Sequence, residues 1–313
     1  MILITGGTGF IGKALIRHLV EAGYQVRTLI RPSQYSPNLP KGVPVEVAVS
    51  GLTDERGLRA AMVGVDIVYH LASAERQGTS GSLLDIDIKG TQAVTHAAAE
   101  AGVKRLFYVS HLGSDRASAF PVLKAKAIAE EHIRRSGIDY TILRSATVFG
   151  PNDGFTSGIA RLLKTIPFVF LLPGDGNTLL QPLWIEDLVT CLAWSLEYDQ
   201  SRNQTYEVGG PEYLTFKQVV ETVAETIGVK RRLIPMRPPY LRAITVFVDH
   251  VLRSMPVSVY WLDYLASNHT CPLSTLPHAF NLMPARFSQR LAYLRGRKWR
   301  YSLVSALFKR RVV

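Results

Sequence analysis

The chain has 313 residues, of which 47% are hydrophobic and 19% are charged, a balance that is typical of a folded globular protein and excludes a largely disordered one. Its formal net charge is +11, and its two cysteines, Cys191 and Cys271, have no cysteine or histidine neighbours at metal-ligand spacing. We therefore expect a cytoplasmic protein without a disulfide framework or a metal site. No apolar run of about 18 residues occurs and the chain opens on a strand-like segment, so neither a transmembrane helix nor a signal peptide is expected.

The first 150 residues alternate short apolar segments with amphipathic ones, the pattern of a parallel α/β sheet. The segments expected as strands are 2–5, 25–30, 45–49, 67–71, 106–110 and 140–144. The segments expected as helices are 11–22, 55–62, 84–101 and 123–136. This order predicts a Rossmann-type, doubly wound parallel sheet over residues 1–150.

The pattern weakens after Gly150-Pro151. Later elements are expected at 168–172 (strand), 173–176 (turn), 185–196 (helix), 206–208 (strand) and 216–227 (helix). We predict a smaller C-terminal α/β lobe over residues 151–285 that holds a substrate or a partner, followed by a basic tail over residues 286–313.

A glycine-rich turn links the first expected strand to the first expected helix. Three glycines allow a tight turn, close approach of the backbone to a pyrophosphate, and packing of the helix on the strand. The N-terminus of the helix adds N–H groups and the positive end of its dipole. We therefore predict that a nicotinamide dinucleotide binds to Gly6, Gly7, Thr8, Gly9, Phe10, Ile11 and Gly12.

The choice of dinucleotide depends on the end of the second strand. An acidic residue there binds the ribose 2′-hydroxyl of NAD, whereas an arginine accommodates the 2′-phosphate of NADP. The sequence has Arg31 and Ser33 and no acid, which favours NADP(H) over NAD(H).

Four segments, 5–12, 66–72, 90–91 and 149–151, resemble the extended, atypical short-chain dehydrogenases/reductases. Segments 109–113 and 126–131 are similar to the branch that contains the accessory nucleotide-binding subunit of respiratory complex I and its bacterial relatives. The resemblance implies NADP(H) binding, with Leu71, Ala72 and Lys126 against the cofactor, but it does not by itself imply turnover.

The chain departs from the family at the catalytic position. Short-chain reductases use a Tyr-x-x-x-Lys pair on one helix face, in which the lysine lowers the tyrosine pKa and the phenol moves the proton. If Lys126 is the lysine, Val122 occupies the tyrosine position; if Lys124 is the lysine, Phe120 does. Neither alignment supplies a hydroxyl.

Two residues at the end of the fifth strand, Ser110 and His111, remain as candidate proton relays or as structural residues at the strand end. Two further positions differ from the family. The segment 50–52 reads Ser-Gly-Leu where relatives have Gly-Asp-Leu, and Asp87 replaces a common asparagine. These differences predict retained binding and weakened catalysis.

Nine Lys/Arg and no Asp/Glu lie between Arg286 and Val313, so the tail carries most of the excess charge. Such a tail fits a membrane surface or a membrane protein complex, or a solvated basic face without a partner; no nucleic-acid motif accompanies it. An apolar stripe between 239 and 254 predicts a helix that either covers the substrate lobe or lies on a membrane or partner.

The sequence supports two main hypotheses. The first is an NADP(H)-binding subunit or assembly scaffold, similar to the complex I accessory subunit, with a degenerate active site and a peripheral place on the membrane. The second is an NADPH-dependent oxidoreductase that acts on a hydrophobic, quinone- or isoprenoid-like substrate. A nucleotide-sugar epimerase is less well supported, because that chemistry requires the tyrosine.

Overall fold

The computed structural model describes residues 1–34, 36–75, 81–251, 259–297 and 299. The chain divides into two compact units: Met1–Ser145 with Ile185–Val208, and Ala146–Trp184 with Gly209–Val313. The sequence pattern predicts boundaries at 150 and 285 and does not reveal that residues 185–208 return to the first unit.

The first unit is built on seven parallel strands in the order β11-β6-β5-β4-β1-β2-β3. The strands are β1 (Ile2–Thr5), β2 (Val26–Ile30), β3 (Glu46–Val49), β4 (Ile67–His70), β5 (Arg105–His111), β6 (Asp139–Ser145) and β11 (Gln204–Val208). From β1, the strands β2 and β3 follow toward one edge of the sheet, and β4, β5, β6 and β11 follow toward the other edge. This reversal confirms the predicted doubly wound, Rossmann-type sheet.

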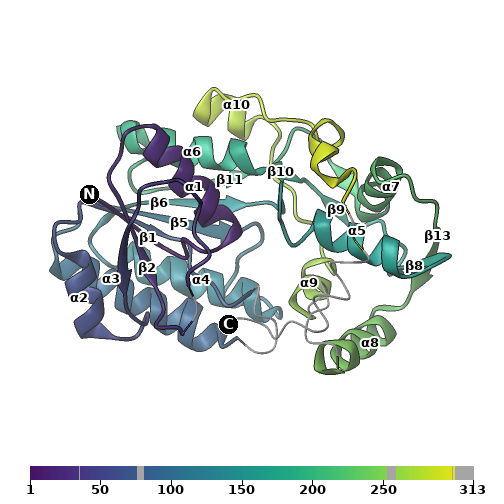
Figure 1. Ribbon diagram of the computed structural model, residues 1–313, viewed down its shortest axis with the longest axis horizontal. Helices are drawn as coiled ribbons and strands as arrows, with labels where there is room; N and C mark the ends of the chain where they lie inside the picture. The colour runs from purple at the N-terminus through teal and green to yellow at the C-terminus, as the bar shows by residue number, and fades with distance from the viewer. Residues whose placement is uncertain (35, 76–80, 252–258, 298, 300–313) are drawn as a thin grey trace. The chain divides into compact units, whose positions relative to one another are not determined.

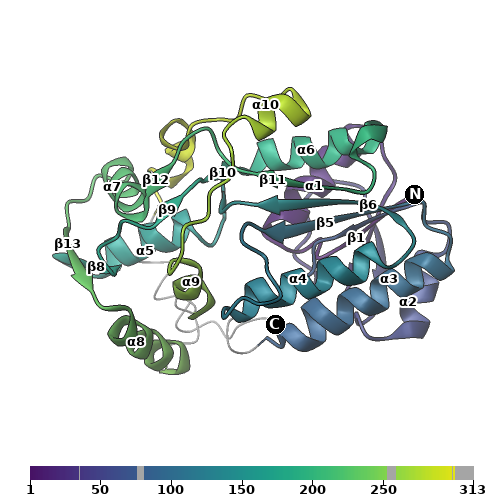
Figure 2. The same ribbon diagram turned by 180° about the vertical axis from the view of Figure 1, so that it is seen from behind.

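Helices cover both faces of this sheet (Figures 1 and 2). They are α1 (Phe10–Glu21), α2 (Glu55–Met62), α3 (Gly90–Glu100), α4 (Pro121–Arg134) and α6 (Ile185–Glu197), with the short helices η2 (Leu84–Lys89) and η3 (Asp199–Ser201). Helices α1 and α6 lie on one face, and α2, α3 and α4 lie on the other. The segment predicted as one helix over 84–101 divides into the π-helical η2 and α3.

The second unit combines three two-stranded sheets with helices. The strand pairs are β7 (Val148–Phe149) with β10 (Leu183–Trp184), β8 (Val169–Pro173) with β13 (Arg232–Met236), and β9 (Leu179–Leu180) with β12 (Leu214–Thr215). The helices are α5 (Thr156–Thr165), α7 (Phe216–Thr226), α8 (Pro238–Val251), α9 (Val259–Tyr264), α10 (Thr275–Phe280) and the 3-10 helix η4 (Phe287–Leu294).

The first part of the predicted basic tail belongs to the core of the second unit. Phe287, Leu291 and Leu294 are buried against α5 and α7, and Trp299 joins the same cluster. Trp299, which belongs to the predicted basic tail, is therefore buried. Lys309, Arg310 and Arg311 lie outside the described residues. Within the described residues, no helix is long and apolar enough to cross a membrane.

Candidate dinucleotide-binding site

The glycine turn follows β1 directly. Gly6 has a φ of +74°, a left-handed conformation that glycine adopts without steric cost. The Gly9 amide donates to the Gly6 carbonyl at 2.9 Å, and α1 begins at the next residue. Among the described residues no side chain caps this helix, so its first N–H groups point outward as donors for an anion.

The turn is packed so closely that only glycine fits. A Cβ on Gly7 would lie 2.1 Å from Thr28 Oγ1, and one on Gly12 would lie 2.3 Å from the Gly6 carbonyl oxygen. A Cβ on Gly6 would lie 2.7 Å from the Ala72 amide nitrogen. Because β1 lies between β2 and β4, the turn also occupies the point where strand order reverses, which is where open α/β sheets bind ligands. The residues present therefore fit a dinucleotide.

A buried chain of hydrogen bonds joins β1, β4 and α3 next to the glycine turn. Thr5 Oγ1 lies 2.7 Å from His70 Nδ1, and His70 Nε2 lies 2.9 Å from Thr91 Oγ1. Since the Thr91 hydroxyl donates to the Asp87 carbonyl at 2.6 Å, it accepts from His70, which makes His70 the neutral Nε2–H tautomer. Burial first, and then the cation of Lys126, lower the pKa of His70 from 6.5 to about 3.

This low pKa predicts acid sensitivity. In the unfolded chain His70 binds a proton near pH 6.5, whereas in the folded protein it does not do so until about pH 3. The contribution of His70 to the free energy of unfolding is therefore fully present above pH 6.5 and is lost as the pH falls toward 3. We expect the free energy of unfolding to fall by about 1.4 kcal/mol per pH unit below pH 6. Urea titrations from pH 4.5 to 7.5 measure it. The His70→Gln variant should lose this component of the slope; an unchanged slope would contradict the assignment.

A buried ion pair links α4 to η2. Lys126 Nζ lies 3.3 Å from Asp87 Oδ1, with side-chain exposures of 5% and 0%. Asp87 Oδ2 also accepts the Ala74 amide at 2.9 Å, which fixes the segment after β4. Burial alone would lower the pKa of Lys126, but Tyr108, Asp87 and Glu75 together raise it above its usual value. The π-helical turn that presents Asp87 is a conformation often found at functional sites.

The structure distinguishes the two candidate lysines. Helix α4 buries Lys126 and leaves Lys124 exposed, so only Lys126 reaches Asp87. Val122 is buried on the same helix, and Phe120 precedes it. A tyrosine does lie near Lys126: its Nζ is 5.2 Å from the ring centre of Tyr108, on β5. Burial raises the pKa of the Tyr108 phenol well above its usual value, so it remains protonated.

The two candidate relays at the end of β5 have different surroundings. Ser110 Oγ lies 3.0 Å from Ser114 Oγ, whose hydroxyl donates to the His111 carbonyl at 2.8 Å, so this pair closes the turn after β5. His111 Nε2 lies 2.7 Å from Glu75 Oε2. Sequence reasoning missed Glu75, although it follows β4 by five positions and the carboxyl ends of neighbouring parallel strands meet at one edge.

The residues expected to choose the cofactor lie beside the turn. Arg31 follows β2 directly, and both it and Ser33 are exposed. Ser50 is 2% exposed and its hydroxyl donates to the Gly51 carbonyl at 3.0 Å, so it shapes the loop between β3 and α2. Arg31 is thus placed at the carboxyl end of the strand next to β1.

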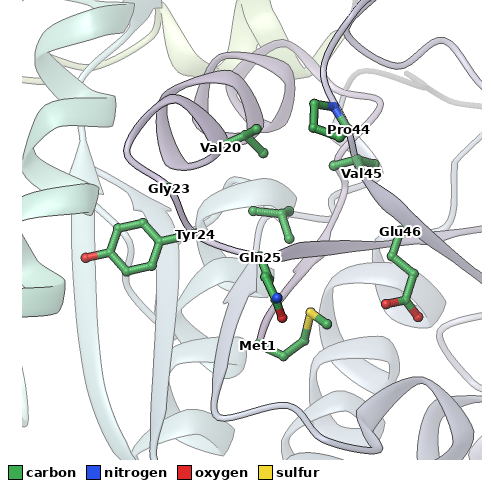
Figure 3. A pocket seen from close by; sticks show the side chains of 9 residues that line it. Met1, Val20, Gly23, Tyr24, Gln25, Pro44, Val45 and Glu46 are labelled. Carbon is green, nitrogen blue, oxygen red and sulfur yellow. The ribbon is translucent and has the colours of Figure 1, made fainter.

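A depression of about 650 Å³ lies at the amino ends of β1, β2 and β3 (Figure 3). Its lining residues are Met1, Val20, Gly23, Tyr24, Gln25, Val26, Pro44, Val45 and Glu46. Val20 lies in the last turn of α1, and the other lining residues precede or begin β1, β2 and β3, whereas the glycine turn follows β1. The depression is therefore separate from the dinucleotide site.

Comparison with known proteins defines the class. A model described as NAD(P)H-binding matches residues 6–164, and one described as the NAD dependent epimerase/dehydratase family matches residues 122–209. The chain belongs to the NAD(P)H-binding family. Its predicted place among the extended short-chain dehydrogenases/reductases is also confirmed.

Individual proteins agree with this class. The chain is 29% identical over 309 residues to NADH dehydrogenase [ubiquinone] 1 alpha subcomplex subunit 9 of Arabidopsis thaliana mitochondria, covering 91% of this chain and 76% of that protein. It is 27% identical to sterol demethylase protein B of Methylococcus capsulatus, covering 80% and 82%. UDP-glucose 4-epimerase of Thermus thermophilus, solved with NAD, has the same fold (TM-score 0.70, 21% identity, coverage 94% and 97%).

Proposed function

We propose that this protein holds a nicotinamide dinucleotide as a resident group and serves as an accessory or assembly subunit of a membrane complex. The main support for the proposal is the ion pair between Lys126 and Asp87. In this pair the lysine of the Tyr-x-x-x-Lys alignment makes a buried structural contact. The cradle for the pyrophosphate is intact, whereas α4 offers no hydroxyl at either tyrosine position. Similarity to a mitochondrial NADH dehydrogenase subunit along most of the chain supports the choice of partner.

Two measurements on the full chain test this proposal. Mass spectrometry of the purified protein should find one bound dinucleotide, and oxidation of NADPH with quinones or ketones should stay at the rate without protein. Native gels of solubilised membranes from the source cells should show the chain migrating with NADH–quinone reductase activity. Steady turnover, or a chain that migrates alone, would reject the proposal.

We infer that the resident dinucleotide is NADP(H). Arg31 is exposed at the end of β2, where a guanidinium pairs with a 2′-phosphate. Replacing Arg31 with aspartate should lower the affinity for NADPH about 10- to 100-fold, since a hydrogen bond to a charged group contributes about 1.5–3 kcal/mol. NADH should be affected little. Fluorescence titration of both nucleotides measures this, with Arg135→Asp at the far end of α4 as a matched charge reversal.

A second function is favoured by the contact between His111 and Glu75. A carboxylate 2.7 Å from the imidazole holds it in one orientation. When bound, NADPH would supply a hydride to the carbonyl carbon of a hydrophobic substrate, and a ring N–H of His111 would give a proton to the carbonyl oxygen, completing reduction to an alcohol. The relative named a sterol demethylase protein motivates sterol ketones as the substrates to test. Turnover that His111→Gln abolishes, and Lys124→Gln does not, would establish this function instead.

A further inference from the structure

Helix α8 of the second unit presents apolar side chains outward. Thr245 is 5% exposed, whereas Tyr240, Ile244 and Val246 are 63%, 43% and 49% exposed. At 100° per residue, these three residues and the exposed Ala243 fall on one arc of the helix, and Thr245 falls outside it. Over residues 240–246, three apolar side chains therefore face away from the core, unlike the usual arrangement of a surface helix.

The strands next to α8 add a second outward apolar group. Phe168, at the start of β8, is 81% exposed and has a φ of +70°. This conformation is uncommon for an aromatic residue. Its carbonyl accepts the Arg232 amide at 2.9 Å, which ties it to β13. Helix α8 follows β13 directly and also lies beside β8.

The same part of the chain is cationic. Residues 226–248 contain five Lys/Arg and no Asp/Glu, whereas α8 itself carries one arginine, Arg242, and one acid, Asp249. Two of the five are engaged, because Arg242 pairs with Asp263 and Arg231 donates to the carbonyls of Leu163 and Ile166. Lys230, Arg232 and Arg237 are exposed, and within the described residues no carboxylate lies within 4.0 Å of them.

We propose that the outer face of α8, with the exposed cations of β13 and its flanks, binds the surface of an anionic lipid bilayer. A helix with exposed tyrosine and aliphatic residues among Lys/Arg lies in the plane of the interface, with its apolar side among the acyl chains and its cations at the phosphates. Exposed aliphatic side chains beside exposed cations match the acyl and phosphate layers of an anionic bilayer, and we therefore choose a bilayer rather than a protein partner. The inference stands apart from the proposed function, since it requires no nucleotide.

Co-sedimentation of the full chain with vesicles tests the inference. Phosphatidylcholine vesicles containing about one third phosphatidylglycerol should bind the protein, pure phosphatidylcholine should bind it much more weakly, and added salt should reduce binding. The double variant Tyr240→Ser/Ile244→Ser should bind about tenfold more weakly. Arg232→Gln and Arg237→Gln should each cost about fivefold.

The matched control is Met283→Ser, which removes an 82% exposed apolar side chain of the same unit from the segment between α10 and η4. It should bind as the original protein does, and the far-UV circular dichroism spectrum and melting temperature of each variant show that it is folded. If the original protein ignores anionic vesicles, or the double variant binds them equally well, the inference is wrong. The second result would assign the attachment to other cations of the chain.

Discussion

Replacing Gly12 with alanine is expected to weaken NADPH binding by at least about 10- to 100-fold. The new Cβ would lie 2.3 Å from the Gly6 carbonyl oxygen and 2.8 Å from the Gly7 Cα. Both contacts are with backbone, so no side chain can move away and α1 must shift from the turn. Overpacking of this kind costs about 1–3 kcal/mol, and each 1.4 kcal/mol is tenfold in affinity. Fluorescence titration with NADPH measures the loss.

A second glycine variant separates a damaged site from general destabilisation. Gly23 lies at the far end of α1 with a φ of +87°, and a Cβ added to it would meet no heavy atom within 4 Å. Gly23→Ala should therefore lower thermal stability by a similar amount, through backbone strain, while leaving NADPH affinity unchanged. If Gly12→Ala binds NADPH normally, the nucleotide does not lie on this turn.

The central sheet could be predicted from sequence because buried parallel strands are short, continuous apolar segments separated by helical patterns. β1 and α2 were predicted at their observed bounds. The two-residue strands β7, β9, β10 and β12 are too short to carry any periodicity, and Pro235 conceals β13. The pairing of β11 with β6 is likewise invisible, since it joins segments about 60 positions apart.

Near the end of the chain, the many arginines obscured the apolar residues that pack in the core. Phe287, Leu291 and Leu294 recur at helical spacing, which predicts a buried stripe, but the surrounding arginines suggested a loose tail. In the site, the glycine turn and Lys126 were predicted from local motifs. The partners of Lys126 could not be, because Asp87 and Tyr108 approach it only through the packing of η2, β5 and α4.

The Lys126→Met variant is expected to lower the free energy of unfolding by about 3 kcal/mol, the largest effect of any single change in the site. It leaves the fully buried Asp87 carboxylate without its cation, and removing one partner of a buried pair costs about 3–5 kcal/mol. Urea denaturation measures the loss. Lys124→Met, which alters an exposed lysine of the same helix, should cost less than about 0.5 kcal/mol.

The double variant Lys126→Met/Asp87→Leu tests whether the pair itself is responsible. Removing both charges relieves the unpaired carboxylate, so the double variant should be more stable than Lys126→Met alone. A loss that is the sum of two independent single losses would show that the two residues do not interact.

The same variants distinguish the two functions. A ligand that binds only the folded protein raises its stability by an amount set by the ratio of free ligand concentration to Kd, so one fixed NADPH concentration adds a measurable increment to each variant. If Lys126 acts through Asp87, as the resident-cofactor proposal requires, the increment in Lys126→Met stays within about 0.5 kcal/mol of that in the original protein. If instead Lys126 binds the nicotinamide ribose, as in active reductases, Lys126→Met loses both free energy of unfolding and part of the increment that NADPH adds. A smaller increment in Lys126→Met, with an unchanged one in Lys124→Met, would therefore return the protein to the class of working reductases.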